Sequence, residues 1–262
     1  MIEPYLEPPY TYILLIVVGL ITSIINTIAG GGSMLTLPIL IFIGLPPTVA
    51  NGTNRLGILS QSITSALGFR SKSVSIFPLG KKVSAFLLIA IVIGSAIGAR
   101  IAVYMDDRVF TKVLAVLIPI IILMIVFQPK TKPISAQETI SSSTPKIILT
   151  TFIYLAIGIY AGFIQAGTGF MIIASLSFLF HLNLVAINAA KTIIVLCIIS
   201  IALSVFIYYQ QVNYGYGLAL AAGNGLGGWW ASRWSVKKGE GVVKVALVVM
   251  ASLIALKLWF DS

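Results

Sequence analysis

Hydrophobic residues occur in ten long runs, and short polar stretches separate them. The runs are continuous rather than alternating, which is the pattern of membrane helices and not of strands in a β-barrel. Most have the length of about twenty residues that an α-helix needs to cross a bilayer. The pattern therefore predicts an all-α, polytopic membrane protein with segments at 10–29, 33–44, 47–69, 83–105, 108–127, 146–166, 169–181, 184–209, 213–232 and 241–260.

Two of these segments are too short to cross a bilayer as straight helices. Segments 33–44 and 169–181 have about twelve and thirteen residues, against about twenty for a full span. Each follows backbone that glycine frees from the helix, GGGS at 30–33 and GTG at 167–169. A helix that starts at such a break directs unpaired N–H groups and partial positive charge inward, which suits an anion.

Glycine has a second interpretation, because it also lets two helices cross closely. This is the better interpretation for two glycine pairs with GxxxG spacing, Gly94 with Gly98 and Gly223 with Gly227. For the triple glycine at 30–32 we favour a binding site at the helix start, and close packing remains the alternative.

A polar stretch at 128–145, rich in Ser, Thr and Pro, divides the chain into an N-terminal part at 1–127 and a C-terminal part at 146–262, with five segments each. Three landmarks recur in the same order in both parts. They are GLITSIINTIAGGGS (19–33) with GIYAGFIQAGTGFMI (158–172), VANGTNR (49–55) with AINAAKT (186–192), and GSAIG (94–98) with GNGLG (223–227). This alignment pairs Asn26 with Gln165, Gly30 with Gly169, and Asn51 with Asn188. The recurrence predicts an internal duplication.

The basic residues predict the orientation in the membrane. Most of the seventeen lie after the third segment, in the linker, or around the turn before the last segment. If the N-terminus is outside and every segment crosses, all three clusters face the cytoplasm, as the positive-inside rule requires. Both termini then lie outside a cell membrane. An odd number of segments in each part makes the two parts inverted repeats, which is the architecture of many secondary transporters.

Composition agrees with a membrane protein. The chain of 262 residues is 58% hydrophobic and 9% charged, with a mean hydropathy of +1.05, whereas soluble domains have about 25% charged residues. The formal charge of +10 follows from the topology and predicts no nucleic-acid partner. A lone cysteine, Cys197, excludes an internal disulfide and a cysteine-based metal cluster. We expect no cofactor and no metal site.

Two cations lie deep within predicted segments. Arg55 and Lys191 are about 13 and 10 Å from the ends of their segments at about 1.5 Å per residue, and the seven acidic residues all lie in tails or predicted loops. An intramembrane cation costs at least about 2.5 kcal/mol, so it faces a cavity or a partner. Either the two cations bind helix C-terminal carbonyls as structural clamps, or an anionic substrate supplies the negative charge. We favour the substrate.

The candidate substrate site combines these cations with the helix starts and nearby polar residues. Amides and hydroxyls here either bind anion oxygens or satisfy backbone groups freed at the breaks, and the sequence does not separate these roles. No catalytic residue is expected. The candidate residues are Arg55, Lys191, Asn26, Gly31, Gly32, Ser33, Thr53, Asn54, Gln165, Thr168, Gly169 and Asn188.

The stretch NTIAGGGSMLTLPIL…GLPPTVANGTN (26–54), its weaker echo at 165–191 and GSAIGAR (94–100) resemble the TauE/SafE sulfite exporter family of membrane proteins. The resemblance covers nearly the whole chain and implies transport of sulfite, sulfonates and related sulfur-containing anions, with export prominent. It marks as family-like Gly30, Gly31, Gly32, Pro38, Gly52 and Thr53. The C-terminal part departs further, with INAAKT where the N-terminal part has ANGTNR.

The sequence and the resemblance together predict an alternating-access carrier that exports a small sulfur oxyanion or organosulfonate across a lipid bilayer. Export of one negative charge from a negative cytoplasm gains about 2.3 kcal/mol per 100 mV, so it needs no coupled ion. The coupling ion and a homo-oligomer are left open. One alternative is an anion channel. A less favoured one is a membrane-embedded enzyme acting on a lipid-linked substrate, because such catalysis needs acid–base or metal-binding groups near the interface.

Overall fold

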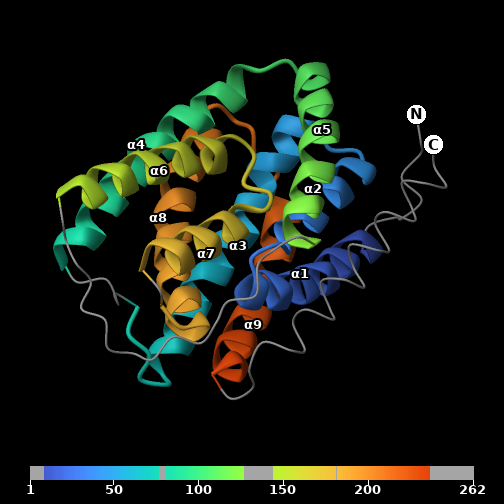
Figure 1. Ribbon diagram of the computed structural model, residues 1–262. Helices are drawn as coiled ribbons and strands as arrows, with labels where there is room; N and C mark the ends of the chain where they lie inside the picture. Colours follow the sequence, from blue (N-terminus) through green and yellow to red (C-terminus); the bar gives the residue numbers. More distant parts are fainter. Residues whose placement is uncertain (1–8, 77–80, 127–143, 181, 237–262) are drawn as a thin grey trace.

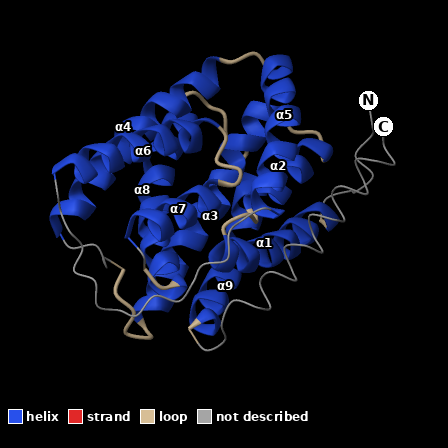
Figure 2. Ribbon diagram, in the orientation of Figure 1, coloured by secondary structure: helices blue, strands red, loops and turns tan. Residues whose placement is uncertain are grey.

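The computed structural model describes residues 9–76, 81–126, 144–180 and 182–236. Within these ranges the chain forms nine α-helices and no strand (Figure 2). Predicted segment 241–260 and nearly all of the predicted linker lie outside the described residues. The helices are α1 (Tyr10–Ala29), α2 (Ser33–Phe42), α3 (Pro47–Arg70), α4 (Lys81–Tyr104), α5 (Asp107–Val126), α6 (Thr144–Phe163), α7 (Thr168–Phe180), α8 (Leu184–Tyr208) and α9 (Tyr214–Ser235).

The two predicted helix breaks are confirmed. Gly30 closes α1 in the left-handed conformation, with φ of 93°, and its N–H donates to the Asn26 carbonyl, which is a common helix end. The second break differs from the prediction, because α6 ends at Phe163 and not at residue 166. Gln165 and Gly167 there have φ of 68° and 72°, and no right-handed helix continues through such values.

Three described helices are long and apolar enough to cross a membrane by length and composition alone: Tyr10–Ala29, Ser84–Tyr104 and Leu184–Tyr208. Helices α3 and α9 are also long, but Asn, Ser, Thr and Gly are spread along them. They pack against each other, and they also contact α8 and α1 respectively. Neighbouring helices thus cover the faces of α3 and α9 that carry buried polar residues, which explains how these helices tolerate them.

Among the described helices, α4 packs closely against α6, and α9 packs closely against both α1 and α3. Figure 1 shows α4 beside α6 and α1 beside α9, with α3, α7 and α8 between these pairs. Both pairs depend on the glycines with GxxxG spacing. A Cβ on Gly94 or Gly98 would run into backbone carbonyls of α6, and one on Gly223 or Gly227 into carbonyls of α1. The prediction that these glycines allow close crossing is confirmed.

Two apolar clusters hold this arrangement together. One consists mainly of side chains from α4, α6, α7 and α8. The other joins α1, α2 and α5 to α9 and to the ends of α4, α6 and α8.

Candidate functional site

The two helix breaks meet in the interior. A Cβ on Gly30 would lie 2.5 Å from the carbonyl carbon of Gly169 and 2.8 Å from the nitrogen of Phe170. A Cβ on Gly31 would enter the Phe170 ring, and one on Gly32 would enter the Thr22 carbonyl of α1. The triple glycine therefore brings three successive pieces of backbone against α7 and α1, where no side chain fits.

Helices α2 and α7 start at this crossing. The N-terminus of α2 has no side-chain cap, since its N-cap residue is Gly32. At the start of α7 the Thr168 hydroxyl donates to the Gln165 carbonyl at 2.8 Å, so it satisfies the break itself. The first N–H groups of a helix have no partner within the helix and carry partial positive charge. At the start of α2 the N–H groups of Met34 and Leu35 already donate to the carbonyls of Gly31 and Gly32, both at 3.1 Å, and the positive end of the α2 dipole lies next to Ser33.

Lys191 of α8 binds the last turn of α1. Its ammonium donates to the Asn26 carbonyl at 2.8 Å, the Thr27 carbonyl at 2.9 Å and Oδ1 of Asn188 at 2.9 Å. The Asn188 amide in turn donates to the Ile28 carbonyl at 3.0 Å. Lys191 and Asn188 together therefore satisfy three successive carbonyls at the end of α1. All three N–H donors of the ammonium are used.

Arg55 of α3 makes matching contacts with the end of α6. Its Nη2 donates to the Gly162 carbonyl at 2.6 Å and to Oδ1 of Asn51 at 3.5 Å, and its Nη1 donates to the Ala161 carbonyl at 3.3 Å. The Asn51 amide donates to the Phe163 carbonyl at 2.7 Å. Three successive carbonyls are again satisfied by one cation and one asparagine.

Both cations thus bind helix C-termini, whose carbonyls lack partners within the helix and carry partial negative charge. These contacts are the ones expected if the two cations act as structural clamps on helix ends. They leave the formal charges without a carboxylate, because the acidic residues within the described ranges are Asp106 and Asp107. Asp107 accepts from the backbone and hydroxyl of Thr48 at the start of α3. Each buried cation is therefore bonded to carbonyls and amides, with no carboxylate beside it among the described residues.

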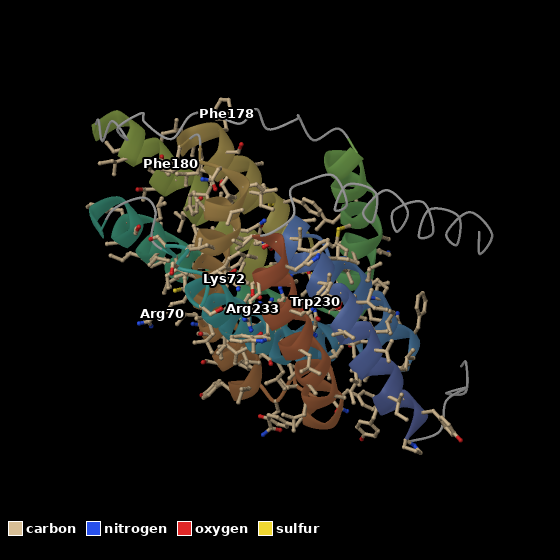
Figure 3. All side chains as sticks on the ribbon, turned by 90° about the horizontal axis from the view of Figure 1, so that it is seen from below. Arg70, Lys72, Phe178, Phe180, Trp230 and Arg233 are labelled. Atoms are coloured by element: carbon tan, nitrogen blue, oxygen red, sulfur yellow. The ribbon has the colours of Figure 1, made fainter. Side chains whose placement is uncertain are left out.

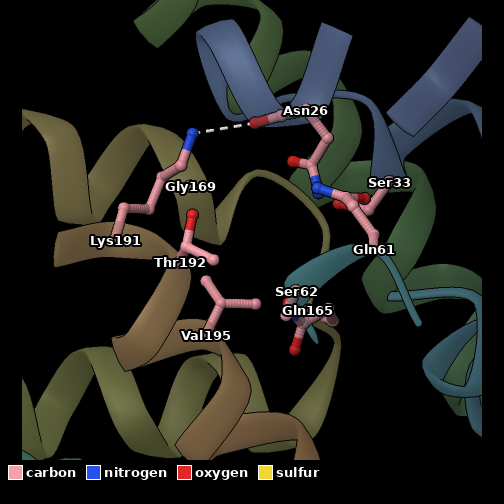
Figure 4. A pocket seen from close by; sticks show the side chains of 9 residues that line it. All are labelled: Asn26, Ser33, Gln61, Ser62, Gln165, Gly169, Lys191, Thr192 and Val195. Carbon is pink, nitrogen blue, oxygen red and sulfur yellow. Dashed lines mark hydrogen bonds between the residues drawn. The ribbon is translucent and has the colours of Figure 1, made fainter. Parts of the chain in front are cut away.

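A small polar cavity lies beside Lys191, with a volume of about 10 Å³. This is about the space that one water molecule needs on this measure. In Figure 4 the Lys191 side chain borders the cavity and points toward the Asn26 carbonyl. The lining residues are Asn26, Ser33, Gln61, Ser62, Gln165, Gly169, Lys191, Thr192 and Val195.

Five of the candidate residues line this cavity together, namely Asn26, Ser33, Gln165, Gly169 and Lys191. Arg55 does not line it. Its guanidinium lies behind Gln165, with Nη1 3.5 Å from Oε1 of Gln165, and its carbon Cζ is 4.7 Å from the centre of the Phe206 ring. Arg55 is fully buried and so acts on the cavity only through Gln165 or through its charge.

Other candidate residues serve the helix framework. The Thr53 hydroxyl accepts from the Asn213 backbone at 2.9 Å and so binds the turn before α9. Asn54 is buried without lining the cavity. Among the described residues, two buried polar side-chain atoms have no hydrogen-bond partner, Oδ1 of Asn54 and Nε of Arg55.

Sequence reasoning missed four lining residues. Of these, Gln61 is the most informative, because its Oε1 accepts from Asn26 at 3.1 Å and its Nε2 donates to Thr27 at 3.3 Å. A glutamine within predicted segment 47–69 was the signal that could have found it, since polar residues inside membrane helices face the protein interior. The other three are Ser62, Thr192 and Val195.

Interrupted helices that meet at a buried, positively charged and polar cavity are characteristic of membrane transport proteins. Comparison with known proteins identifies the family. The model of the family described as "Sulfite exporter TauE/SafE" matches residues 15–258, and the chain belongs to this family of membrane transporters.

Relatives cover almost the full length of the chain. A probable membrane transporter protein of Haemophilus influenzae is 29% identical over 252 residues, covering 95% of this chain and 94% of the relative. The probable membrane transporter protein YfcA of Escherichia coli K12 is 26% identical over 259 residues, covering 98% and 93%. The probable membrane transporter protein ORF9 of a Sinorhizobium species is 26% identical over 247 residues, covering 94% and 92%. No solved structure matches the chain significantly.

Proposed function

We propose that this protein is a secondary carrier that exports a small sulfur oxyanion, such as sulfite or an organosulfonate, across the cell membrane. The observation that carries the proposal is the buried ammonium of Lys191. It borders a polar cavity where two broken helices meet, and no carboxylate among the described residues neutralises it. The family description supports the substrate class, and the names of the relatives support transport.

The carrier is built from two inverted repeats of five segments, at 1–127 and 146–262, joined by a cytoplasmic linker at 128–145. Mirrored contacts support this architecture. The Cβ of a side chain on Gly94 would strike the Leu155 carbonyl of α6, and one on Gly223 would strike the Ile16 carbonyl of α1. Positions 16 and 155 are paired by the register that pairs Asn26 with Gln165. Helix α4 thus crosses α6 as α9 crosses α1.

The two asparagines also support the repeats. Asn51 and Asn188 are paired by the sequence alignment, and each donates to a carbonyl at the end of the broken helix of the other repeat. Each also accepts from the neighbouring cation on its own helix. Every repeat thereby holds the helix break of its partner.

Anion binding requires a rearrangement at Lys191. All three of its donors are already used, and a cavity of about 10 Å³ has less room than an anion of four or five heavy atoms requires. The anion oxygens therefore replace a carbonyl of α1 at the ammonium while the cavity widens. The side-chain amides of Asn26 and Gln165, which line the cavity, supply further donors. Substrate binding and movement of the end of α1 are thus coupled.

The basic ends of α3 and α9 support a cytoplasmic location for this face. Arg70, Lys72 and Arg233 gather there (Figure 3), and the positive-inside rule assigns such clusters to the cytoplasm. Both termini then lie outside. Moving one anion outward gains about 2.3 kcal/mol per 100 mV of inside-negative potential, which favours export.

Flux into and out of proteoliposomes tests the proposal. Purified protein is reconstituted, and uptake of radiolabelled sulfite or methanesulfonate is measured under an imposed potential of each sign. We expect saturable flux that follows the potential, and counterflow when unlabelled anion is preloaded. Flux no greater than in protein-free vesicles for every anion tested would refute the substrate class. Flux without saturation or counterflow would indicate a channel.

A further inference from the structure

We infer that the anion moves between the cavity and the basic face along a polar seam between α1, α3 and α9. We define this polar seam as Asn26, Thr27, Gln61, Ser65 and Ser232, all of them buried. The inference rests on the proposed function, since it names the route that serves the proposed site.

The polar seam begins at the cavity. Asn26 and Gln61 both line it, and the Asn26 amide donates to Gln61 at 3.1 Å. Gln61 donates to the Thr27 hydroxyl at 3.3 Å, which lies 3.1 Å from the hydroxyl of Ser65. These are bonds between side chains, which can exchange a partner for a passing anion or water without breaking the backbone of a helix.

The polar seam continues to the end of the bundle through small residues. A Cβ on Gly228 of α9 would lie 2.7 Å from the Ser65 hydroxyl. A Cβ on Gly68 of α3 would enter the hydroxyl of Ser232. Helices α3 and α9 therefore approach each other here through glycines and hydroxyls, and the fully buried Phe69 lies one helical turn beyond Ser65 in α3.

Cations surround the outer end of the polar seam. Arg70 is exposed, and Lys72 and Arg233 are partly exposed. The Arg233 guanidinium lies 5.0 Å from the Trp229 ring centre. Figure 3 shows these three basic residues near one another. A cluster of positive charge on a protein surface raises the local concentration of anions.

In α8 of the other proposed repeat, the positions aligned with Gln61 and Ser62 of α3 are apolar. The register that pairs Asn51 with Asn188 pairs Gln61 with Ile198 and Ser62 with Ile199. Both isoleucines are fully buried in the cluster that α4, α6 and α8 share. The polar character of the α3 side of the seam therefore belongs to one proposed repeat alone, and duplication does not explain it.

Helix packing does not explain the polar character of the seam either. Small hydroxyls commonly hold membrane helices together through backbone carbonyls, and this occurs on both sides. Ser23 donates to the Asn224 carbonyl, and Ser95 donates to the Ile198 carbonyl, at 2.7 and 2.8 Å. The pair of Asn26 and Gln61 differs, because its amides bind each other at the border of the cavity.

Cysteine accessibility tests the route, with a matched control. In a Cys197→Ala background, Ser65→Cys is compared with Ser95→Cys, since the native serines are exposed by only 1% and 0%. Membrane vesicles of known orientation are treated with a methanethiosulfonate that carries a sulfonate and with one that carries a trimethylammonium group. We expect Ser65→Cys to react at least about tenfold faster than Ser95→Cys with the anionic reagent, because the basic residues at the outer end of the polar seam raise its local concentration. The reaction should occur from the side of Arg70 and be slowed by methanesulfonate.

Equal rates at both positions, faster reaction of Ser95→Cys, or reaction of Ser65→Cys from the opposite side would each overturn the inference. If Ser65→Cys does not fold, Ser232→Cys takes its place with the same expectations. The labelling does not require sulfite flux. Labelling as expected without transport would therefore refute the proposed substrate and support the route. Transport with preferential labelling of Ser95→Cys would support the proposed substrate and refute the route.

Discussion

Gly30 and Gly169 lie backbone against backbone where the two broken helices meet. This contact joins the end of α1 to the first turn of α7, and it brings the starts of α2 and α7 to one polar cavity. The contact leaves no space for a methyl group on either residue, so this arrangement of the site requires glycine at both positions.

The first prediction concerns this contact. Gly30→Ala should lower stability through both its positive φ of 93° and its collision with Gly169, by about 1–2 kcal/mol for the φ and about 1–3 kcal/mol for overpacking. Gly44→Ala is the matched control, because Gly44 has φ of 100° with nothing near its Cβ. Unfolding in increasing dodecyl sulfate measures both variants. Equal losses in the two variants would contradict a role for the contact.

The second prediction separates substrate binding from support at Lys191. Lys191→Gln keeps amide donors for the carbonyls of α1 but removes the charge. We expect anion flux to fall at least about tenfold, equivalent to about 1.4 kcal/mol, with little change in the thermal midpoint. Lys112→Gln, which removes an exposed lysine of α5, should leave both unchanged. A large loss of stability in Lys191→Gln with flux per folded protein preserved would indicate that the lysine is only a clamp.

The third prediction follows from the matching asparagines. Asn51→Ala and Asn188→Ala each leave a buried carbonyl unpaired, at Phe163 and Ile28 respectively. Each should cost about 1–3 kcal/mol, and the two losses should be similar. Chemical unfolding of both variants supplies the comparison. A loss confined to one asparagine would show that the two helix ends are held differently.

The fourth prediction uses the backbone of Gln165, whose φ of 68° is unfavourable for a residue with a Cβ. Gln165→Gly should be more stable than Gln165→Ala by about 1 kcal/mol, since only glycine adopts this conformation without strain. Both variants should transport more slowly, because both remove an amide that lines the cavity. Thermal unfolding and flux, measured on the same preparations, provide the check. Full transport by either variant would exclude Gln165 from the site.

Local pattern was enough to predict the helices and their interruptions. Segment 10–29 coincides with α1, and segments 33–44 and 169–181 agree with α2 and α7 within two residues at each end. Continuous apolar runs make helices in a membrane, and glycine ends them, so both features depend on neighbours in the chain. The C-terminal end of α6 was wrong by three residues, because Gln165 adopts a left-handed conformation that glutamine seldom takes.

The pairing of residues across the bundle was decided by tertiary structure. Sequence alone identified Arg55 and Lys191 as buried cations and aligned Asn51 with Asn188. The rotation of each helix about its axis then determined that Lys191 borders the cavity while Arg55 lies behind Gln165. It also turned Gln61 toward Asn26. That rotation follows from the close crossings of α1 with α9 and of α4 with α6. These crossings join residues far apart in the chain, so the local sequence pattern does not predict them.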